Sequence, residues 1–178
     1  MEHLKIKQIF LPTFSLVMVA LVMTSLTFTV NLLTAERIQA IADADLIAAK
    51  EGIFPQAEDF TRETVLIAGE ETRYYIVGDN DGYIFITSAI GYGGNMVVVV
   101  GINTDGYVIG VEVIEHEETP LLGTQVFDYE FVSQFKVSYT PQGFTVGYNI
   151  DTISGATITV DALIETVNYA IEIYLEVR

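Results

Sequence analysis

The sequence predicts an α+β protein in which one amino-terminal membrane-spanning helix precedes an antiparallel sheet packed against helices. Three observations lead to this prediction. No charged residue occurs between Lys7 and Glu36, so this stretch is apolar enough for a membrane. Apolar runs separated by Asp-Gly turns in the middle of the chain are typical of hairpins. Helical spacing of apolar residues from Thr157 to Val177 indicates an amphipathic helix.

The composition limits the class of function. Of the 178 residues, 51% are hydrophobic and 18% are charged, which is too apolar for a disordered chain and fits one domain beside the membrane segment. The formal net charge of -16 disfavours nucleic-acid binding. Because the chain has no cysteine and only His3 and His116, it lacks the usual ligands of zinc, haem and iron–sulfur sites. We expect no metal, and we expect any redox chemistry to use an organic cofactor.

The apolar stretch Ile9–Leu33 is predicted to be a retained membrane anchor. As a helix it would be roughly 37 Å long, enough to cross a hydrocarbon core of about 30 Å. The alternative, a cleaved signal peptide, has a shorter apolar region of about 7–15 residues followed by a small-x-small site. Here the run is longer and continues into Thr34-Ala35-Glu36-Arg37, which favours the anchor.

Flanking charges predict the orientation of this anchor. Lys5 and Lys7 precede it, and the positive-inside tendency places the amino terminus in the cytoplasm. Residues 1–35 carry a net charge of +1 and the remainder carries -17, so the large domain would not lie flat on anionic lipid. We expect a single-pass protein of the cytoplasmic membrane with its carboxyl-terminal domain extracytoplasmic.

The chain divides by composition into four predicted parts. These are a cytoplasmic amino terminus (1–8), a transmembrane helix (9–33), a helical stalk (34–52) and an outer domain (53–178). The stalk is predicted because its residues are rich in alanine, leucine and isoleucine at helical spacing. Phe54 and Pro55 then end the helical pattern.

Within the outer domain, the pattern predicts a short strand at Thr64–Ala68 and two hairpins. The first hairpin pairs Thr72–Val77 with Tyr83–Ser88, and the second pairs Met96–Ile102 with Tyr107–Ile114. Met96–Ile102 is continuously apolar, which predicts a central strand covered on both faces. The remaining predicted elements are a short helix at Gln125–Phe135, an edge strand at Phe144–Tyr148 and the helix Thr157–Val177.

The segment before the last helix has features of an anion site. Ser154 is placed to cap the helix, while Gly155 and Ala156 keep the turn small. The free N–H groups of a helix start favour a phosphate, and Thr157 offers a hydroxyl in the first turn. By composition alone, however, an ordinary serine-capped helix accounts for the same residues.

The same segment reads D-x-x-S-G-A-T and resembles the flavinylation motif of the FMN-binding domain family. That family includes the G subunit of the Rnf ion-translocating oxidoreductase and the C subunit of the sodium-translocating NADH:quinone reductase. The resemblance implies that Thr157 carries FMN through a phosphoester bond made by a flavin transferase from FAD. It also implies that Asp151 is recognised during flavinylation and that Ser154, Gly155 and Ala156 contact the cofactor.

Two further segments carry the resemblance. Gly91-Tyr92-Gly93-Gly94 matches the family's GYGG, and His116–Gly123 matches its H-x-E-T-P-G-L-G loop. Leu121 stands where the family pattern has glycine, and leucine tolerates a positive φ poorly. The resemblance implies that these segments supply further cofactor-binding residues, namely Tyr92, Gly93, Glu118, Thr119, Leu122 and Gly123.

The resemblance implies an electron-transfer subunit of a membrane-bound, Rnf-type ferredoxin:NAD oxidoreductase that relays electrons through covalent FMN. Its implied partners are the other membrane subunits and, during maturation, a flavin transferase. Ile9–Leu33 contains no ionisable residue, so ion transport would fall to other subunits. Three alternatives remain open: a stand-alone extracytoplasmic flavoprotein, the corresponding quinone reductase subunit, and an anchored interaction module without cofactor.

Overall fold

The computed structural model describes residues 2–67, 69–137 and 143–178. It divides into two compact units, one ending at Asp43 and the other running from Ala44 to Arg178. Helix α1 (Glu2–Ile53) begins in the first unit, and by length and composition its part Pro12–Ile53 could cross a membrane. The hydroxyls of Thr27 and Thr29 donate to carbonyls four residues earlier, at 2.9 and 2.8 Å. Such bonds satisfy polar groups inside the helix, as lipid requires.

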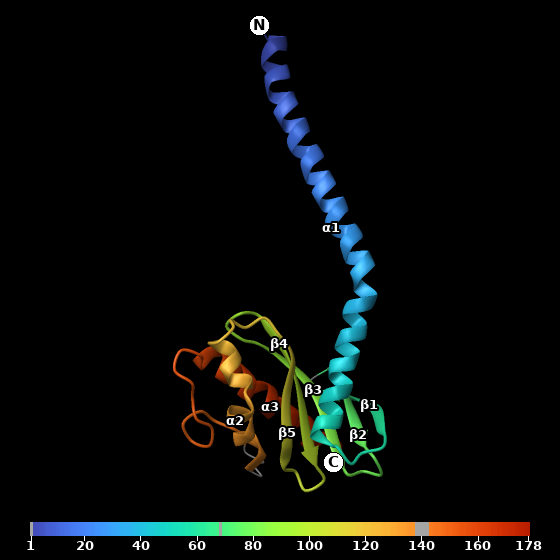
Figure 1. Cartoon of the computed structure of the whole chain (residues 1–178), viewed down its shortest axis with the longest axis vertical. Coiled ribbons are helices and arrows are strands. Elements are labelled where there is room, and N and C mark those ends of the chain that lie inside the picture. The colour runs from blue at the N-terminus through green and yellow to red at the C-terminus, as the bar shows by residue number, and fades with distance from the viewer. Residues whose placement is uncertain (1, 68, 138–142) are drawn as a thin grey trace. The chain divides into compact units, whose positions relative to one another are not determined.

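The second unit is built on a five-stranded antiparallel meander with the order β1-β2-β3-β4-β5 (Figure 1). This confirms the predicted α+β class and both hairpins, and each strand is longer than its sequence pattern suggested. The pairing puts β4 between β3 and β5, as expected for the apolar run. The strands are β1 (Phe60–Ile67), β2 (Glu70–Val77), β3 (Gly82–Ile90), β4 (Asn95–Asn103) and β5 (Val108–His116).

The two faces of the sheet are covered by different helices (Figure 1). Helix α3 (Thr157–Val177), whose extent matches the prediction, packs on the face that carries Phe85 and Val98. Tyr174 on α3 meets the Tyr83 ring edge-on, with centroids 5.6 Å apart, and donates a hydrogen bond to the Thr104 carbonyl at 2.9 Å. These contacts fix α3, and therefore the start of α3, against the sheet.

The opposite face holds the last turns of α1, which the sequence assigned to a stalk. Ala49 is fully buried there, and Ile53 fills a notch made by the cross-strand pair Gly101 and Gly110. A Cβ at Gly110 would lie 2.8 Å from Ile53 Cγ1, and one at Gly101 would lie closer still to Ile53 Cγ2. The two glycines are therefore required by side-chain packing rather than by their backbone angles.

Two predicted elements are wrong. The helix expected at Gln125–Phe135 is three short segments, because extended backbone at Asp128 (ψ 145°) interrupts it. Phe131 and Phe135 are nonetheless buried, whereas Phe127 is only partly covered. The segments are η1 (Gly123–Phe127), α2 (Tyr129–Val132) and η2 (Ser133–Val137).

The edge strand expected at Phe144–Tyr148 does not form, and only an isolated bridge joins Val146 to Ile150. The Asn168 side chain takes the place of a neighbouring strand. Its amide oxygen accepts the Phe144 N–H at 2.6 Å, and its amide nitrogen donates to the Phe144 carbonyl at 3.0 Å. A polar side chain on α3 has therefore replaced the backbone ladder that the apolar pattern suggested.

Candidate functional site

The start of α3 lacks a side-chain cap. The N-cap residue is Ala156, so the prediction that Ser154 caps the helix is wrong. Gly155 turns the chain with a φ of +87°, and the first hydrogen bond into the helix joins the Val160 N–H to the Ala156 carbonyl at 2.9 Å. Amides that precede Val160 in the first turn have no intrahelical acceptor, and the helix dipole is positive here. This arrangement suits an anionic group such as a phosphate.

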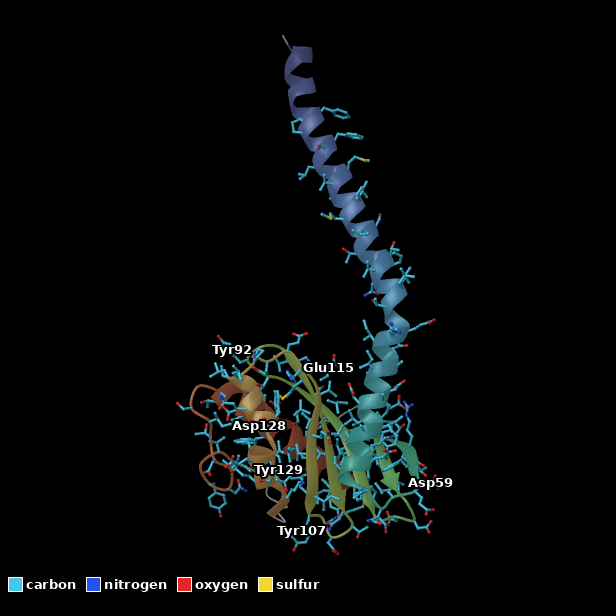
Figure 2. All side chains as sticks on the ribbon, in the orientation of Figure 1. Asp59, Tyr92, Tyr107, Glu115, Asp128 and Tyr129 are labelled. Atoms are coloured by element: carbon cyan, nitrogen blue, oxygen red, sulfur yellow. The ribbon has the colours of Figure 1, made fainter. Side chains whose placement is uncertain are left out.

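Thr157 is exposed at the first position of α3, directly after the buried Ala156. Its hydroxyl is thus presented to solvent from a backbone that the core holds in place. Asp151 donates its N–H to Gln134 Oε1 at 2.8 Å. It lines a cavity of about 470 Å³ together with Asp128 of the α2 start, which is labelled in Figure 2. Ile153 lines the same cavity, and its carbonyl accepts the N–H of the N-cap residue Ala156 at 3.0 Å.

The loop after β5 folds into a compact turn in which three backbone N–H groups donate to one carbonyl. The Thr119 carbonyl accepts N–H groups from Leu122 at 3.3 Å, Gly123 at 3.1 Å and Thr124 at 3.4 Å. Within this turn Leu121 has a φ of +66°, and its N–H donates to Thr124 Oγ1 at 3.0 Å. The position thus takes the left-handed conformation that glycine adopts at least cost, which is the physical reason for the family's glycine there.

We expect Leu121→Gly to raise the free energy of unfolding by about 1 kcal/mol, because glycine removes the cost of a left-handed leucine. Little apolar burial is lost, since the Leu121 side chain is 85% exposed. Urea unfolding of the full chain in detergent measures the change. Leu122→Gly is the matched control, and it should be destabilising because the Leu122 side chain lies next to the Gly155 turn, with Cδ1 3.2 Å from the Cβ position of Gly155. Equal effects of both substitutions would contradict the strain explanation.

The GYGG turn joins β3 to β4 and packs directly on the loop after β5. The Gly91 N–H donates to the Gly94 carbonyl at 2.8 Å, and the Tyr92 side chain is 69% exposed at the end of the sheet opposite Tyr107 (Figure 2). A Cβ at Gly93 would overlap the Glu117 carbonyl. The resemblance implies that Gly93 binds the cofactor, and the structure adds that its missing side chain makes room for the neighbouring loop.

Glu118 points inward, between the two loops. It is 5% exposed, and neither carboxylate oxygen has a hydrogen-bond partner among the described residues. A Cβ at Gly91 would overlap Oε1, and one at Gly123 would lie 2.5 Å from Oε2. The carboxylate therefore occupies a cradle that exists only because residues 91 and 123 are glycines.

The three motif segments lie side by side. Gly91 and Gly93 contact the Glu117–Glu118 backbone and side chains, and Leu122 Cδ1 lies 3.2 Å from the Cβ position of Gly155. Tyr92 and Leu122 expose apolar surface there, which suits a flat aromatic ring, while the α3 start suits a phosphate. The residues present thus fit an FMN group.

Sequence reasoning missed three residues of this region. Gly91 and Met96 form part of the cradle around Glu118, and Thr159 has a buried hydroxyl without a hydrogen-bond partner in the described chain. Gly91 was visible as part of the GYGG motif, but nothing in the local pattern marks Met96 or Thr159. Lys136 lies over the Tyr129 ring at 5.1 Å, beside β5.

His116, which had no assigned catalytic role, supports the same loop. Its Nδ1 accepts the Glu118 N–H at 3.3 Å, and its ring lies 4.8 Å from the Phe127 ring between centroids. The histidine thus holds the loop backbone near β5 and packs on η1. His116 therefore has a structural role, and among the described residues it makes no contact with Thr157.

Comparison with known proteins identifies the family to which this chain is related. Residues 91–172 match the FMN-binding domain, a range that includes all three motif segments. The chain is 31% identical to the G subunit of the ion-translocating oxidoreductase complex of Methanosarcina acetivorans, covering 86% of each protein. It is 28% identical to the G subunit of the complex of the same name from Shewanella oneidensis, covering 88% of this chain and 84% of that protein.

Among solved structures, the fold is similar to the C subunit of the Na⁺-translocating NADH-quinone reductase from Parabacteroides distasonis. The TM-score is 0.51 at 18% identity, over 67% of this chain and 77% of that one. This likeness concerns the fold, whereas the relatives above are similar along most of the sequence. The chain therefore belongs to the FMN-binding family of G subunits of ion-translocating oxidoreductase complexes.

Proposed function

We propose that this chain is the electron-transfer subunit of an Rnf-type ion-translocating ferredoxin:NAD oxidoreductase and carries FMN covalently on Thr157. The observation that carries the proposal is the exposed Thr157 at an uncapped helix start, two residues after Gly155, whose Cβ position lies 3.2 Å from Leu122 Cδ1 in the loop after β5. Relatives named as G subunits of such complexes, and the FMN-binding match over residues 91–172, support it.

The local geometry favours a phosphoester at this position. A phosphodiester keeps one negative charge, which the free first-turn amides and the helix dipole stabilise. Gly155, with a φ of +87°, turns the chain before the helix, and the buried Ala156 holds the backbone next to the ester. FMN, when bound, supplies reversible uptake of electrons. The residues proposed to border its ring are Tyr92, Thr119 and Leu122, and those that hold the loops are Gly93, Gly123 and Glu118.

Covalent attachment suits a carrier on the outer side of a membrane, because a released flavin would be lost. We propose that residues 1–8 are cytoplasmic, that 9–33 span the membrane, that 34–52 continue as helix, and that 53–178 form an extracytoplasmic FMN domain. The proposed partners are the other membrane subunits of the complex and the flavin transferase that recognises the segment containing Asp151. Ion transport belongs to those other subunits, since 9–33 lacks ionisable residues.

Intact mass spectrometry tests the cofactor and its position together. Chain co-expressed with a flavin transferase should gain the mass of FMN less one water, on the peptide that contains Thr157. Chain expressed without the transferase should be unmodified and colourless, which is the matched control. An unmodified peptide in protein purified from its native membrane would contradict the proposal. Copurification of multi-helix subunits from the same membrane supports the complex over a stand-alone flavoprotein.

The proposed orientation has a clean test because the chain contains no cysteine. Thr104→Cys places a thiol on the exposed β4–β5 turn, and we expect a membrane-impermeant maleimide to label it in intact cells. His3→Cys, on the proposed cytoplasmic side, should be labelled only after the cells are permeabilised. The reverse labelling pattern would overturn the orientation.

A further inference from the structure

The buried carboxylate of Glu118 has no described counter-charge. Its oxygens have neither a hydrogen-bond partner nor a salt bridge in the described chain, although the residue is only 5% exposed. One oxygen faces Gly91, beside which Met96 lies, and the other faces Gly123, while the exposed His116 accepts the Glu118 backbone N–H through Nδ1. Burying a carboxylate in this way is costly, so a structural role alone explains its presence poorly.

Of the five lysines and arginines in residues 44–178, Arg62 and Arg73 lie on β1 and β2, and the other three lie over aromatic rings. Lys50 lies over the Tyr75 ring at 4.1 Å, Lys136 over the Tyr129 ring at 5.1 Å, and Arg178 over the Tyr174 ring at 5.9 Å. The neighbours of Glu118 in sequence, Glu115 to Glu117, are exposed and mainly acidic. Within the part of the chain that the structure describes, no fixed positive charge therefore pairs with the buried carboxylate.

Glu118 lies against the GYGG turn and within the loop after β5, and this loop in turn lies near the third motif segment. One oxygen lies against Gly91 of the GYGG turn and the other against Gly123. Leu122, the residue before Gly123, lies near Gly155, where an added Cβ would be 3.2 Å from Leu122 Cδ1, and Gly155 is two positions before Thr157. A cofactor bordered by these segments would lie close to a negative charge that water cannot reach.

We propose that Glu118 is a potential-setting residue, whose buried charge lowers the reduction potential of the flavin held at Thr157. The inference rests on the proposed function. Reduction adds an electron to the flavin, and a fixed negative charge nearby opposes that addition. A charge shielded from solvent, like that of Glu118, acts on a neighbouring group more strongly and is less screened by salt than the same charge at the surface. In this proposal Glu118 acts on the flavin through the electrostatic field of its carboxylate and forms no bond with the cofactor.

A pair of neighbouring isosteric substitutions tests the proposal in the full flavinylated chain. Glu118→Gln removes the buried charge, and Glu117→Gln removes an exposed one next to it. In spectroelectrochemical titration, Glu118→Gln should raise the ratio of reduced to oxidised flavin at least tenfold at a fixed ambient potential, about 59 mV for one electron. Glu117→Gln should change that ratio less than threefold. No shift with Glu118→Gln, or equal shifts with both substitutions, would overturn the proposal.

The flavin-free chain, expressed without the transferase, supplies a second measurement. Glu118→Gln should raise its midpoint of urea unfolding, because a neutral amide is cheaper to bury than a carboxylate, and Glu117→Gln should leave the midpoint unchanged. An unchanged midpoint with Glu118→Gln overturns the buried-charge premise, even if this variant takes up no flavin. Absence of flavin from the unsubstituted chain would instead contradict the proposed function, so the two failures are distinguishable.

Discussion

Thr157→Ala is expected to abolish covalent flavin completely while the domain remains folded. The substitution removes the only proposed attachment atom, the side-chain hydroxyl. It disturbs little else, because Thr157 is exposed and alanine is a good residue for the start of a helix. We therefore expect the free energy of unfolding to change by less than about 0.5 kcal/mol. In-gel flavin fluorescence after denaturation and intact mass measure the first effect, and urea unfolding measures the second.

Two controls separate attachment from damage to the loop. Thr157→Ser keeps a hydroxyl and should retain flavin, in whole or in part. Thr152→Ala removes an exposed threonine from the same segment and should leave full modification. Flavin that remains bound to Thr157→Ala after denaturation would show that the attachment residue is wrong, and peptide mapping would then locate the modified residue.

Gly93→Ala is expected to have the second largest effect, a loss of about 2–3 kcal/mol of stability together with reduced flavin loading. The added Cβ would overlap the Glu117 carbonyl oxygen and lie 2.8 Å from the Glu118 Cα, so it meets backbone rather than a movable side chain. Either the β3–β4 turn or the loop after β5 must shift, and both border the proposed flavin position. Urea unfolding and the ratio of flavin to protein after maturation measure the two effects.

The matched control is Gly52→Ala, the same chemical change at a site with room for it. A Cβ at Gly52 would lie 3.5 Å from its nearest neighbour, Glu112 Oε2, which is an ordinary contact. We expect this variant to keep wild-type stability or gain slightly, and to keep full flavin loading. If Gly93→Ala behaves like Gly52→Ala, the close packing of the two loops is not what the site requires.

Sequence patterns predicted a helix or strand correctly where its formation depends on residues within that segment alone. The periodicity of Thr157–Val177 matches helix α3, because an amphipathic stripe depends on spacing within the helix. Asp-Gly turns between apolar runs predicted both hairpins, and the continuous apolar run Met96–Ile102 predicted that β4 lies inside the sheet. The patterns failed at Phe144–Tyr148, where the Asn168 side chain, distant in sequence, takes up the backbone hydrogen bonds.

The sequence alone predicted an apolar helix long enough to cross a membrane, the antiparallel meander and the last helix, and it revealed the three motifs that suggest a flavin site. Charge gaps, periodicity and short motifs are local properties and can be read from one segment. Tertiary structure alone decided that Glu118 points inward, that Gly91 and Gly123 make room for it, and that Leu122 reaches the Gly155 turn. Each of these depends on the distance between atoms of segments far apart in the chain. Packing on the sheet sets such distances, and they cannot be predicted from the spacing of residues within a single segment.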